Sequence, residues 1–271
     1  MKIRGKKVLI TGAAGGIGKA LAMELAARGA DLFLSDVNDT GLHPIRHQIE
    51  SLGRTCHIAQ TDISRKDRVK EMIDDAVDRM GQVDILINNA GVTIIGEIRH
   101  VPLEDWEWIM GVNLWGPIYT VHYILPHMLE RQQGHIVNMG SMGGLTAVPA
   151  NGTYNVTKFG LAGFSEVLRA ELKKHNIRVT LICPGFLSSG EEFEKRGRVR
   201  GFKKFKPGAF AKGGSMPVDK AAKRFADAIE KDQFLVTTGI IGPFYYGIKR
   251  IFPWLYYRIG EKIAVDLEKW Y

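Results

Sequence analysis

Short apolar runs alternate with segments of helical periodicity along most of the chain. The apolar runs predict strands at residues 7–11, 31–35, 55–60, 83–88, 135–139 and 178–183. Between and after them, apolar positions recur on one helix face, which predicts helices at residues 17–28, 40–52, 65–80, 103–131, 153–175 and 217–232. Continuously apolar strands separated by helices imply a parallel sheet that is covered on both faces. We therefore expect an α/β protein with a doubly wound parallel sheet in a three-layer α/β/α arrangement.

The same pattern predicts the domain organisation. No repeat or linker interrupts residues 1–240, which we expect to form one domain. Regular periodicity is lost between the last strand and residue 217, and a stretch of this length is typical of a functional lid, here residues 186–216. Residues 241–271 form a C-terminal helical extension, in which Pro253 interrupts the helical spacing and predicts two short helices.

Composition narrows the class of protein. The chain has 271 residues, of which 45% are hydrophobic and 24% charged, a balance that excludes disorder and disulfide-rich scaffolds. Cys56 and Cys183 lie far apart, and His43 and His47 share a helix face without a third ligand, so we expect no metal site and no disulfide. Since the polar first residues run directly into a strand and no apolar stretch of about 18 residues occurs, we expect a cytoplasmic protein.

The net charge of +8 is concentrated in the predicted lid. Residues 195–212 hold eight lysines and arginines and no acid, so the rest of the chain sums to zero. The lid also holds phenylalanines, including Phe186 and Phe202. A basic, aromatic lid suits a lipophilic substrate with an anionic end or an anionic bilayer surface, although a solvated basic loop is an equal alternative. No recognition motif accompanies the charge, so we expect no nucleic-acid partner.

Aromatic side chains gather at the C-terminus, where residues 244–271 hold nine of the 25 in the chain. Lys249, Arg250 and Arg258 are interleaved with them. Such a surface fits core packing or a subunit interface, and it also fits a membrane surface that it touches without spanning.

A glycine-rich turn joins the first predicted strand to the first helix. Gly12, Gly16 and Gly18 let the backbone approach a pyrophosphate, and the helix that opens at Ile17 offers unpaired N–H donors. Asp36 ends the second strand, where a carboxylate accepts hydrogen bonds from an adenosine ribose. A 2′-phosphate there would meet like charge, and positions 13, 14 and 37 supply no cation. The sequence therefore predicts NAD rather than NADP.

With these motifs in place, the chain resembles the short-chain dehydrogenase/reductase family, in its compact single-domain branch. The resemblance covers roughly residues 6–235 and rests on motifs in the family's order, namely Thr-Gly-x-x-x-Gly-x-Gly at 11–18, Asp62-Ile63, Asn88-Asn89-Ala90-Gly91 and Pro184-Gly185. It implies a Rossmann-type fold. It also implies cofactor contacts from a set of loop residues, which are Asp62, Ile63, Asn89, Ala90, Gly91, Pro184, Gly185, Leu187 and Ser189. Leu187 and Ser189 depart from the family's usual valine and threonine, although serine keeps the hydroxyl.

Tyr154 and Lys158 are four residues apart on a predicted helix, so they share one face. A phenol with a pKa of ~10 acts as a base near neutral pH only if its pKa falls by ~3 units, or about 4 kcal/mol. A nearby ammonium and a positive nicotinamide ring both favour the phenolate. The resemblance implies that Tyr154 is the acid/base, that Lys158 also holds the nicotinamide ribose, that Ser141 bonds the substrate oxygen and that Asn113 holds a relay water.

The sequence thus predicts an NAD-dependent oxidoreductase that interconverts an alcohol and a ketone or aldehyde on a lipophilic substrate. One alternative is a 3-oxoacyl-[acyl-carrier] reductase, since the basic lid would dock an acidic carrier. Another is a dinucleotide-responsive binding module with an idle tetrad. We expect a homo-dimer or homo-tetramer, and peripheral contact with a membrane through the lid and the C-terminus is a further hypothesis.

Overall fold

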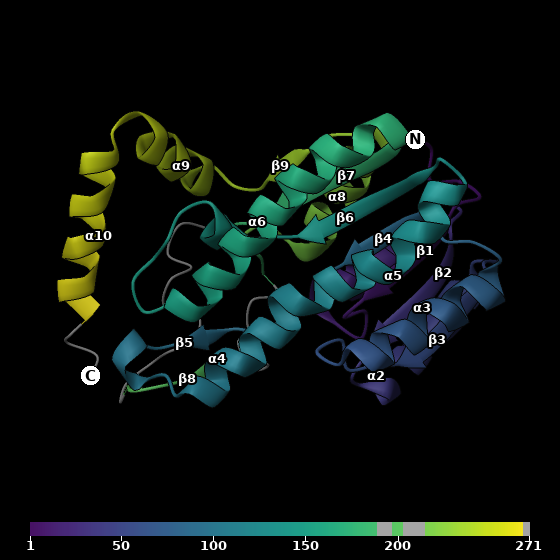
Figure 1. The fold of residues 1–271 in the computed structure, drawn as a ribbon, viewed down its shortest axis with the longest axis horizontal. Coiled ribbons are helices and arrows are strands. Elements are labelled where there is room, and N and C mark those ends of the chain that lie inside the picture. Colours follow the sequence, from purple (N-terminus) through teal and green to yellow (C-terminus); the bar gives the residue numbers. More distant parts are fainter. Residues whose placement is uncertain (189–196, 203–214, 268–271) are drawn as a thin grey trace.

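The computed structural model describes residues 1–188, 197–202 and 215–267. Seven parallel strands form its main sheet in the order β3-β2-β1-β4-β6-β7-β9 (Figure 1). Their bounds are β1 Lys7–Thr11, β2 Asp31–Asp36, β3 Cys56–Gln60, β4 Ile85–Asn88, β6 Gly134–Met139, β7 Ile177–Cys183 and β9 Leu235–Thr237. The strand order reverses between β1 and β4, so a crevice opens at their carboxyl ends. The predicted doubly wound α/β sheet of Rossmann type is confirmed.

Helices cover both faces of this sheet. One layer consists of α1 Gly16–Ala27, α2 Asp39–Ser51 and α8 Val218–Glu230, and the other of α3 Lys66–Met80, α5 Gly116–Glu130 and α6 Gly152–Leu172. Since successive strand residues point to opposite faces, Val8 and Ile10 pack into the first layer and Leu9 into the second. The three-layer expectation is therefore also confirmed.

The single helix predicted at 103–131 is wrong in one respect. The segment forms α4 Leu103–Met110, a π-helical turn Gly111–Trp115 and then α5. It passes close to the turn after β3, where a Cβ on Gly116 would lie 2.6 Å from the Ile63 side chain. The π turn carries Asn113, which is fully buried. Such turns are frequent at functional sites because they redirect one side chain without ending the helix.

The predicted lid contains regular structure that the sequence pattern did not indicate. Arg198–Val199 form a short strand, β8, which pairs in parallel with β5 Ile94–Ile95. Met216 forms a separate bridge with Leu187, so the two ends of the lid are tied to each other. Two-residue strands that are about a hundred positions apart in the chain leave no periodic signal.

The C-terminal extension forms two helices, α9 Ile241–Ile251 and α10 Pro253–Leu267, as the position of Pro253 predicts. Figure 1 shows both in yellow at one end of the molecule, with α10 standing apart from the sheet. Gly242 at the start of α9 lies against Met142, where an added Cβ would be 2.6 Å from the Met142 side chain. Among the helices described, none has the length and apolar character needed to cross a bilayer.

Candidate active site

A cavity of about 1020 Å³ lies at the carboxyl ends of β1, β4, β6 and β7. Its lining includes most of the residues that the sequence predicts for a cofactor or for catalysis, which are Gly12, Gly16, Ile17, Asp36, Asp62, Ile63, Asn89, Ala90, Gly91, Ser141, Tyr154, Lys158, Pro184, Gly185 and Leu187. Gly18 and Asn113 lie just behind this lining. Ser189 falls outside the described residues.

The glycine turn forms one end of the cavity. Gly12 and Gly16 have φ of +67° and +54°, a backbone conformation that suits glycine. Gly18 is buried beneath the turn, because a Cβ there would lie 2.2 Å from the carbonyl oxygen of Gly12. Gly15 caps α1 without a side chain, so no side-chain oxygen occupies the helix N-terminus. This end of the cavity therefore fits a pyrophosphate.

Asn89 holds the turn in place from the neighbouring strand. Its side-chain amide donates to the carbonyl oxygens of Thr11 and Gly12 at 3.1 and 2.8 Å. The hydroxyl of Thr11 in turn accepts from the backbone N–H groups of Asn89 and Ala90. The ends of β1 and β4 are thus locked together directly beneath the predicted phosphate site.

Asp36 stands at the end of β2 and is 5% exposed. Its two carboxylate oxygens accept backbone N–H groups of Ala14 and Asn38, each at 2.9 Å. These bonds fix a negative charge at the cavity wall. Val37 beside it is exposed and carries no charge, so the wall fits two ribose hydroxyls better than a phosphate.

Asn113 reaches the catalytic end of the cavity from the π turn. Its carboxamide closes two 2.9 Å hydrogen bonds with the backbone of Val92 and donates to the hydroxyl of Thr157 at 3.2 Å. Gly91 leaves a gap in front of it, since a Cβ there would be 3.4 Å from Asn113 Oδ1 and 3.7 Å from Lys158 Nζ. The structure thus brings Asn113 and Lys158 to the same place.

Tyr154, Lys158 and Ser141 lie together at the end of β6. Tyr154 forms a side-chain hydrogen bond with Ser141, and the Lys158 ammonium lies 5.7 Å from the centre of the Tyr154 ring. Lys158 is 3% exposed and donates to the carbonyl oxygen of Met139 at 2.8 Å. The predicted face shared by Tyr154 and Lys158 is therefore present and is turned toward the cavity.

Burial is the main cause of the pKa shifts of Tyr154 and Lys158. Burial raises the pKa of Tyr154 to about 12, and the hydrogen bond with Ser141 lowers it only in part. Burial lowers the pKa of Lys158 to about 8, so the amine is still mostly protonated at pH 7. The protein alone therefore disfavours the phenolate, because desolvation outweighs the hydrogen bond with Ser141.

Cys183 belongs to this cluster, although its position in an apolar strand predicts only a core residue. It is fully buried at the end of β7, and its burial raises the thiol pKa to about 12. A hydrogen bond from the Ser141 backbone and the charge of Lys158 act in the opposite direction but are weaker. Cys183 is therefore a neutral thiol packed behind Ser141.

The other half of the cavity is apolar and comes from elements that the sequence does not assign to the site. Trp108 of α4 and Ile95 of β5 line it on the lid side. Tyr245 of α9 and Tyr256 and Ile259 of α10 line it on the C-terminal side. Tyr256 donates to the carbonyl oxygen of Ala147 at 2.7 Å, which holds α10 on the loop after β6. The C-terminal extension is thus a wall of the cavity.

Asp105 ties the lid to this wall. Its side chain is 3% exposed and accepts hydrogen bonds from both Arg198 and Arg200 of the lid, at 2.6 Å for Arg200 Nε. The two guanidinium groups hold the pKa of Asp105 below its usual value, although burial acts against this. Arg198 also stacks 3.8 Å from the centre of the Trp108 ring. Two of the eight lid cations therefore share one carboxylate, which offsets one of their two positive charges.

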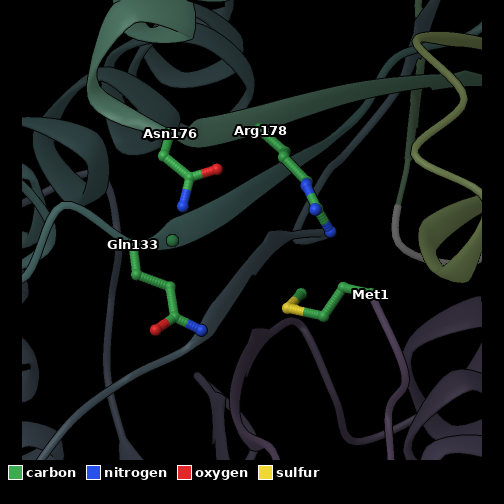
Figure 2. A pocket seen from close by; sticks show the side chains of 5 residues that line it. Met1, Gln133, Asn176 and Arg178 are labelled. Carbon is green, nitrogen blue, oxygen red and sulfur yellow. The ribbon is translucent and has the colours of Figure 1, made fainter.

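A second cavity, of about 140 Å³, lies at the opposite ends of β6 and β7. Figure 2 shows Met1, Gln133, Asn176 and Arg178 around it. It is far too small for a dinucleotide. Within the described ranges, no three His, Cys, Asp or Glu side chains form a metal site here or elsewhere.

Three polar residues that hold the site were not predicted to do so. They are Thr11, which anchors Asn89, Thr157, which holds Asn113, and Asn138, which joins Asn88 to Ser165 through hydrogen bonds of 2.9 Å inside the sheet. Thr11 lies within the glycine motif, so the motif itself was a signal. Thr157 and Asn138 carry no pattern of their own, because their partners come from distant elements.

Similarity to known proteins shows the family to which the chain belongs. The short chain dehydrogenase family matches residues 6–197. The chain is similar to "3-oxoacyl-[acyl-carrier-protein] reductase FabG" of Thermotoga maritima, with 31% identity over 78% of this chain and 87% of that protein. It is similar to "Dehydrogenase/reductase SDR family protein 7-like" of Anopheles gambiae, with 31% identity over 98% and 85% of the two chains.

Solved structures agree with these relatives. A short-chain dehydrogenase/reductase from Burkholderia phymatum, solved in complex with NAD, superposes with a TM-score of 0.84 at 28% identity, over 92% of this chain and 94% of that one. The family match, the relatives and the fold lead to one conclusion. The chain belongs to the short-chain dehydrogenase/reductase family of NAD(P)-binding oxidoreductases.

Proposed function

We propose that this protein is an NAD-dependent oxidoreductase that interconverts an alcohol and a ketone or aldehyde on a lipophilic substrate. The observation that carries the proposal is the position of Tyr154, Ser141 and Lys158 in one cavity with the glycine turn and Asp36. The apolar half of that cavity, lined by Trp108 and by the C-terminal helices, supports the lipophilic substrate.

The residues of the cluster have separate tasks in the oxidation. The nicotinamide ring of a bound cofactor would accept the hydride from the alcohol carbon. Ser141 Oγ holds the substrate oxygen, and Tyr154 Oη takes the hydroxyl proton. Lys158 would hold the nicotinamide ribose, and its positive charge favours the phenolate. Asn113 behind it would hold a relay water. In the reverse direction Tyr154 returns the proton to the carbonyl oxygen.

The pKa of about 12 for Tyr154 gives this mechanism a physical requirement. A fall of ~5 units to reach neutrality corresponds to about 7 kcal/mol. Lys158, with a pKa of about 8, places its amine 5.7 Å from the centre of the Tyr154 ring. That amine is held 2.8 Å from the Met139 carbonyl oxygen. We propose that a bound cofactor would supply the rest through the positive charge of its nicotinamide ring.

The decisive experiment replaces Tyr154 by phenylalanine. We expect Tyr154→Phe to bind NADH with unchanged affinity, by fluorescence titration, and to lose at least about a thousandfold in single-turnover hydride transfer. Tyr123→Phe, on α5 outside the cavity, is the matched control and should keep full turnover. Turnover retained by Tyr154→Phe would refute the mechanism. If the unaltered protein binds NADH but turns over none of a broad panel of alcohols and carbonyl compounds, the binding module is supported instead.

A 3-oxoacyl-[acyl-carrier] reductase is the second candidate, and the similarity to the Thermotoga maritima protein favours it. Docking of an acidic carrier needs free cations, however, and Arg198 and Arg200 are paired with Asp105. The test compares a 3-oxoacyl chain on its carrier protein with the same chain on a small thioester. A strong preference for the carrier form would favour this candidate.

We also propose that the protein works as a homo-dimer or homo-tetramer. Exposed apolar residues on α6 and on the π turn beside it support this proposal, among them Trp115, Val156 and Val167. Contact with a membrane through the lid stays a prediction, since most of its cations lie outside the described residues.

A further inference from the structure

The corner between α9 and α10 exposes large apolar side chains next to arginines. Residues 250–254 are all exposed in succession. Ile251, Phe252 and Trp254 are 69%, 51% and 60% exposed, and Tyr257 one turn later is 60% exposed. We call Arg250, Ile251, Phe252, Trp254, Tyr257 and Arg258 the C-terminal corner. A soluble surface rarely groups so many large apolar side chains without a partner.

The two faces of α10 explain why these side chains point outward. Tyr256, Ile259 and Ile263 repeat at helical spacing and line the cavity. Trp254, Tyr257 and Arg258 lie on the other face and are exposed. The inner face of α10 therefore packs at the cavity, and the corner lies on the outer face, away from the core. Further along the outer face the exposed residues include Glu261, Lys262 and Val265, so the large aromatic side chains lie at the end near α9.

The charges of the corner favour an anionic bilayer over a second copy of the chain. Residues 233–260 contain three cations and no acid. In a twofold contact the same patch meets itself, so Arg250 and Arg258 would meet a patch that holds two cations and no carboxylate. An anionic headgroup layer supplies that missing charge.

The aromatic side chains of the corner are those that suit a headgroup layer. The guanidinium of Arg258 lies 6.0 Å from the Trp254 ring centre, and that of Arg250 lies 5.8 Å from the Tyr246 ring centre. Tryptophan and tyrosine favour the boundary between headgroups and acyl chains, while arginine keeps its charge in the headgroup layer. The side chains are therefore already paired in the way that a shallow insertion requires.

From these observations, we propose that the C-terminal corner docks the protein on anionic phospholipid bilayers, with Phe252 and Trp254 inserted and Arg250 and Arg258 among the headgroups. Since α10 separates the corner from the cavity by the thickness of one helix, docking brings a lipophilic substrate to the cavity wall. That second consequence rests on the proposed function, but the docking itself does not.

The test is flotation of the full-length protein with vesicles of phosphatidylcholine, with or without about one third phosphatidylglycerol. We expect binding to the anionic vesicles only, weakened by salt. Phe252→Ser/Trp254→Ser and Arg250→Gln/Arg258→Gln should each lower the partition coefficient at least about tenfold. The matched controls replace exposed residues away from the corner and should bind normally. They are Leu52→Ser, just after α2, and Arg65→Gln/Arg68→Gln at the start of α3.

Each other result would overturn the docking proposal. Absence of vesicle binding by the folded protein would exclude it, and undiminished binding by both corner variants would place the contact elsewhere, for instance in the lid. If the corner substitutions instead dissociate an oligomer in light scattering, a second copy covers the corner. Tyr154→Phe should bind vesicles normally, so failure of the proposed reaction and failure of docking are separable.

Discussion

Asp36 is the residue on which the proposed preference for NAD over NADP rests. Both of its oxygens are held by backbone N–H groups, so its charge is fixed at the cavity wall. We expect Asp36→Asn to raise kcat/KM with NADPH relative to NADH at least about tenfold, or about 1.4 kcal/mol, because the repulsion of a 2′-phosphate is removed. Steady-state kinetics with the two cofactors measures this ratio. Asp39→Asn on α2 is the control, and an unchanged ratio in Asp36→Asn would remove this residue from cofactor selection.

His135 gives the stability of the protein a dependence on pH. It is fully buried in β6, with Nε2 2.9 Å from the Thr180 hydroxyl, and burial lowers its pKa to about 3. The unfolded chain takes up a proton near pH 6.5 and the folded chain does not, so this contribution is present above pH 6.5 and is lost as the pH falls toward 3. The loss amounts to ~5 kcal/mol, at about 1.4 kcal/mol for each unit of pKa difference.

Urea unfolding at a series of pH values measures this effect. We expect His135→Leu to flatten the fall in the free energy of unfolding between pH 6.5 and 4 relative to the unaltered protein. His47→Gln, on the exposed side of α2, should keep the full slope. Equal slopes for both variants would mean that other groups cause the acid sensitivity.

At the scale of elements, one buried carboxylate links the side chains of the lid to α4. Asp105 joins α4 to β8 through Arg198 and Arg200, and Arg198 in turn covers Trp108 at the cavity wall. We expect Asp105→Asn to raise the substrate KM about tenfold and to leave the affinity for NADH unchanged, since the neutral amide loses about 1–2 kcal/mol of pairing. Asp75→Asn, which breaks an exposed pair on α3, is the control. A matching loss of NADH affinity would show that Asp105 acts on the whole fold.

The elements also show how far the sequence predicts this protein. The buried strands and the helices around them leave a continuous apolar signal, so β1, β2, β3, β4, β6, β7 and the three layers follow from the pattern. The glycine turn, Asp36, Tyr154 and Lys158 follow from short motifs, because each depends on a local spacing. The π turn that carries Asn113 and the pairing of β5 with β8 do not follow, because contacts between distant segments determine them.

At the scale of the whole molecule, the proposed homo-oligomer needs a face that contacts a second copy of the chain, and we propose the exposed face of α6. Val156, Gly160, Gly163 and Val167 form an exposed stripe along α6, and Trp115 stacks on Tyr119 beside its first turns. The stripe has few side-chain atoms, so a helix from another copy can approach closely. An uncharged patch of this kind satisfies the self-complementarity that a twofold axis demands, in contrast to the cationic C-terminal corner.

This difference between the two surfaces leads to a prediction for the assembly. We expect Val156→Asp/Val167→Asp to be monomeric in light scattering at concentrations where the unaltered protein is a dimer or tetramer, because like charges would meet across the axis. Val265→Asp on α10 places the same charge on an apolar side chain that is 63% exposed, and it should leave the assembly intact. If Val265→Asp dissociates the protein and the α6 variant does not, the C-terminal helices form the subunit contact. The corner would then be covered by protein, so this measurement tests the assembly and the bilayer contact together.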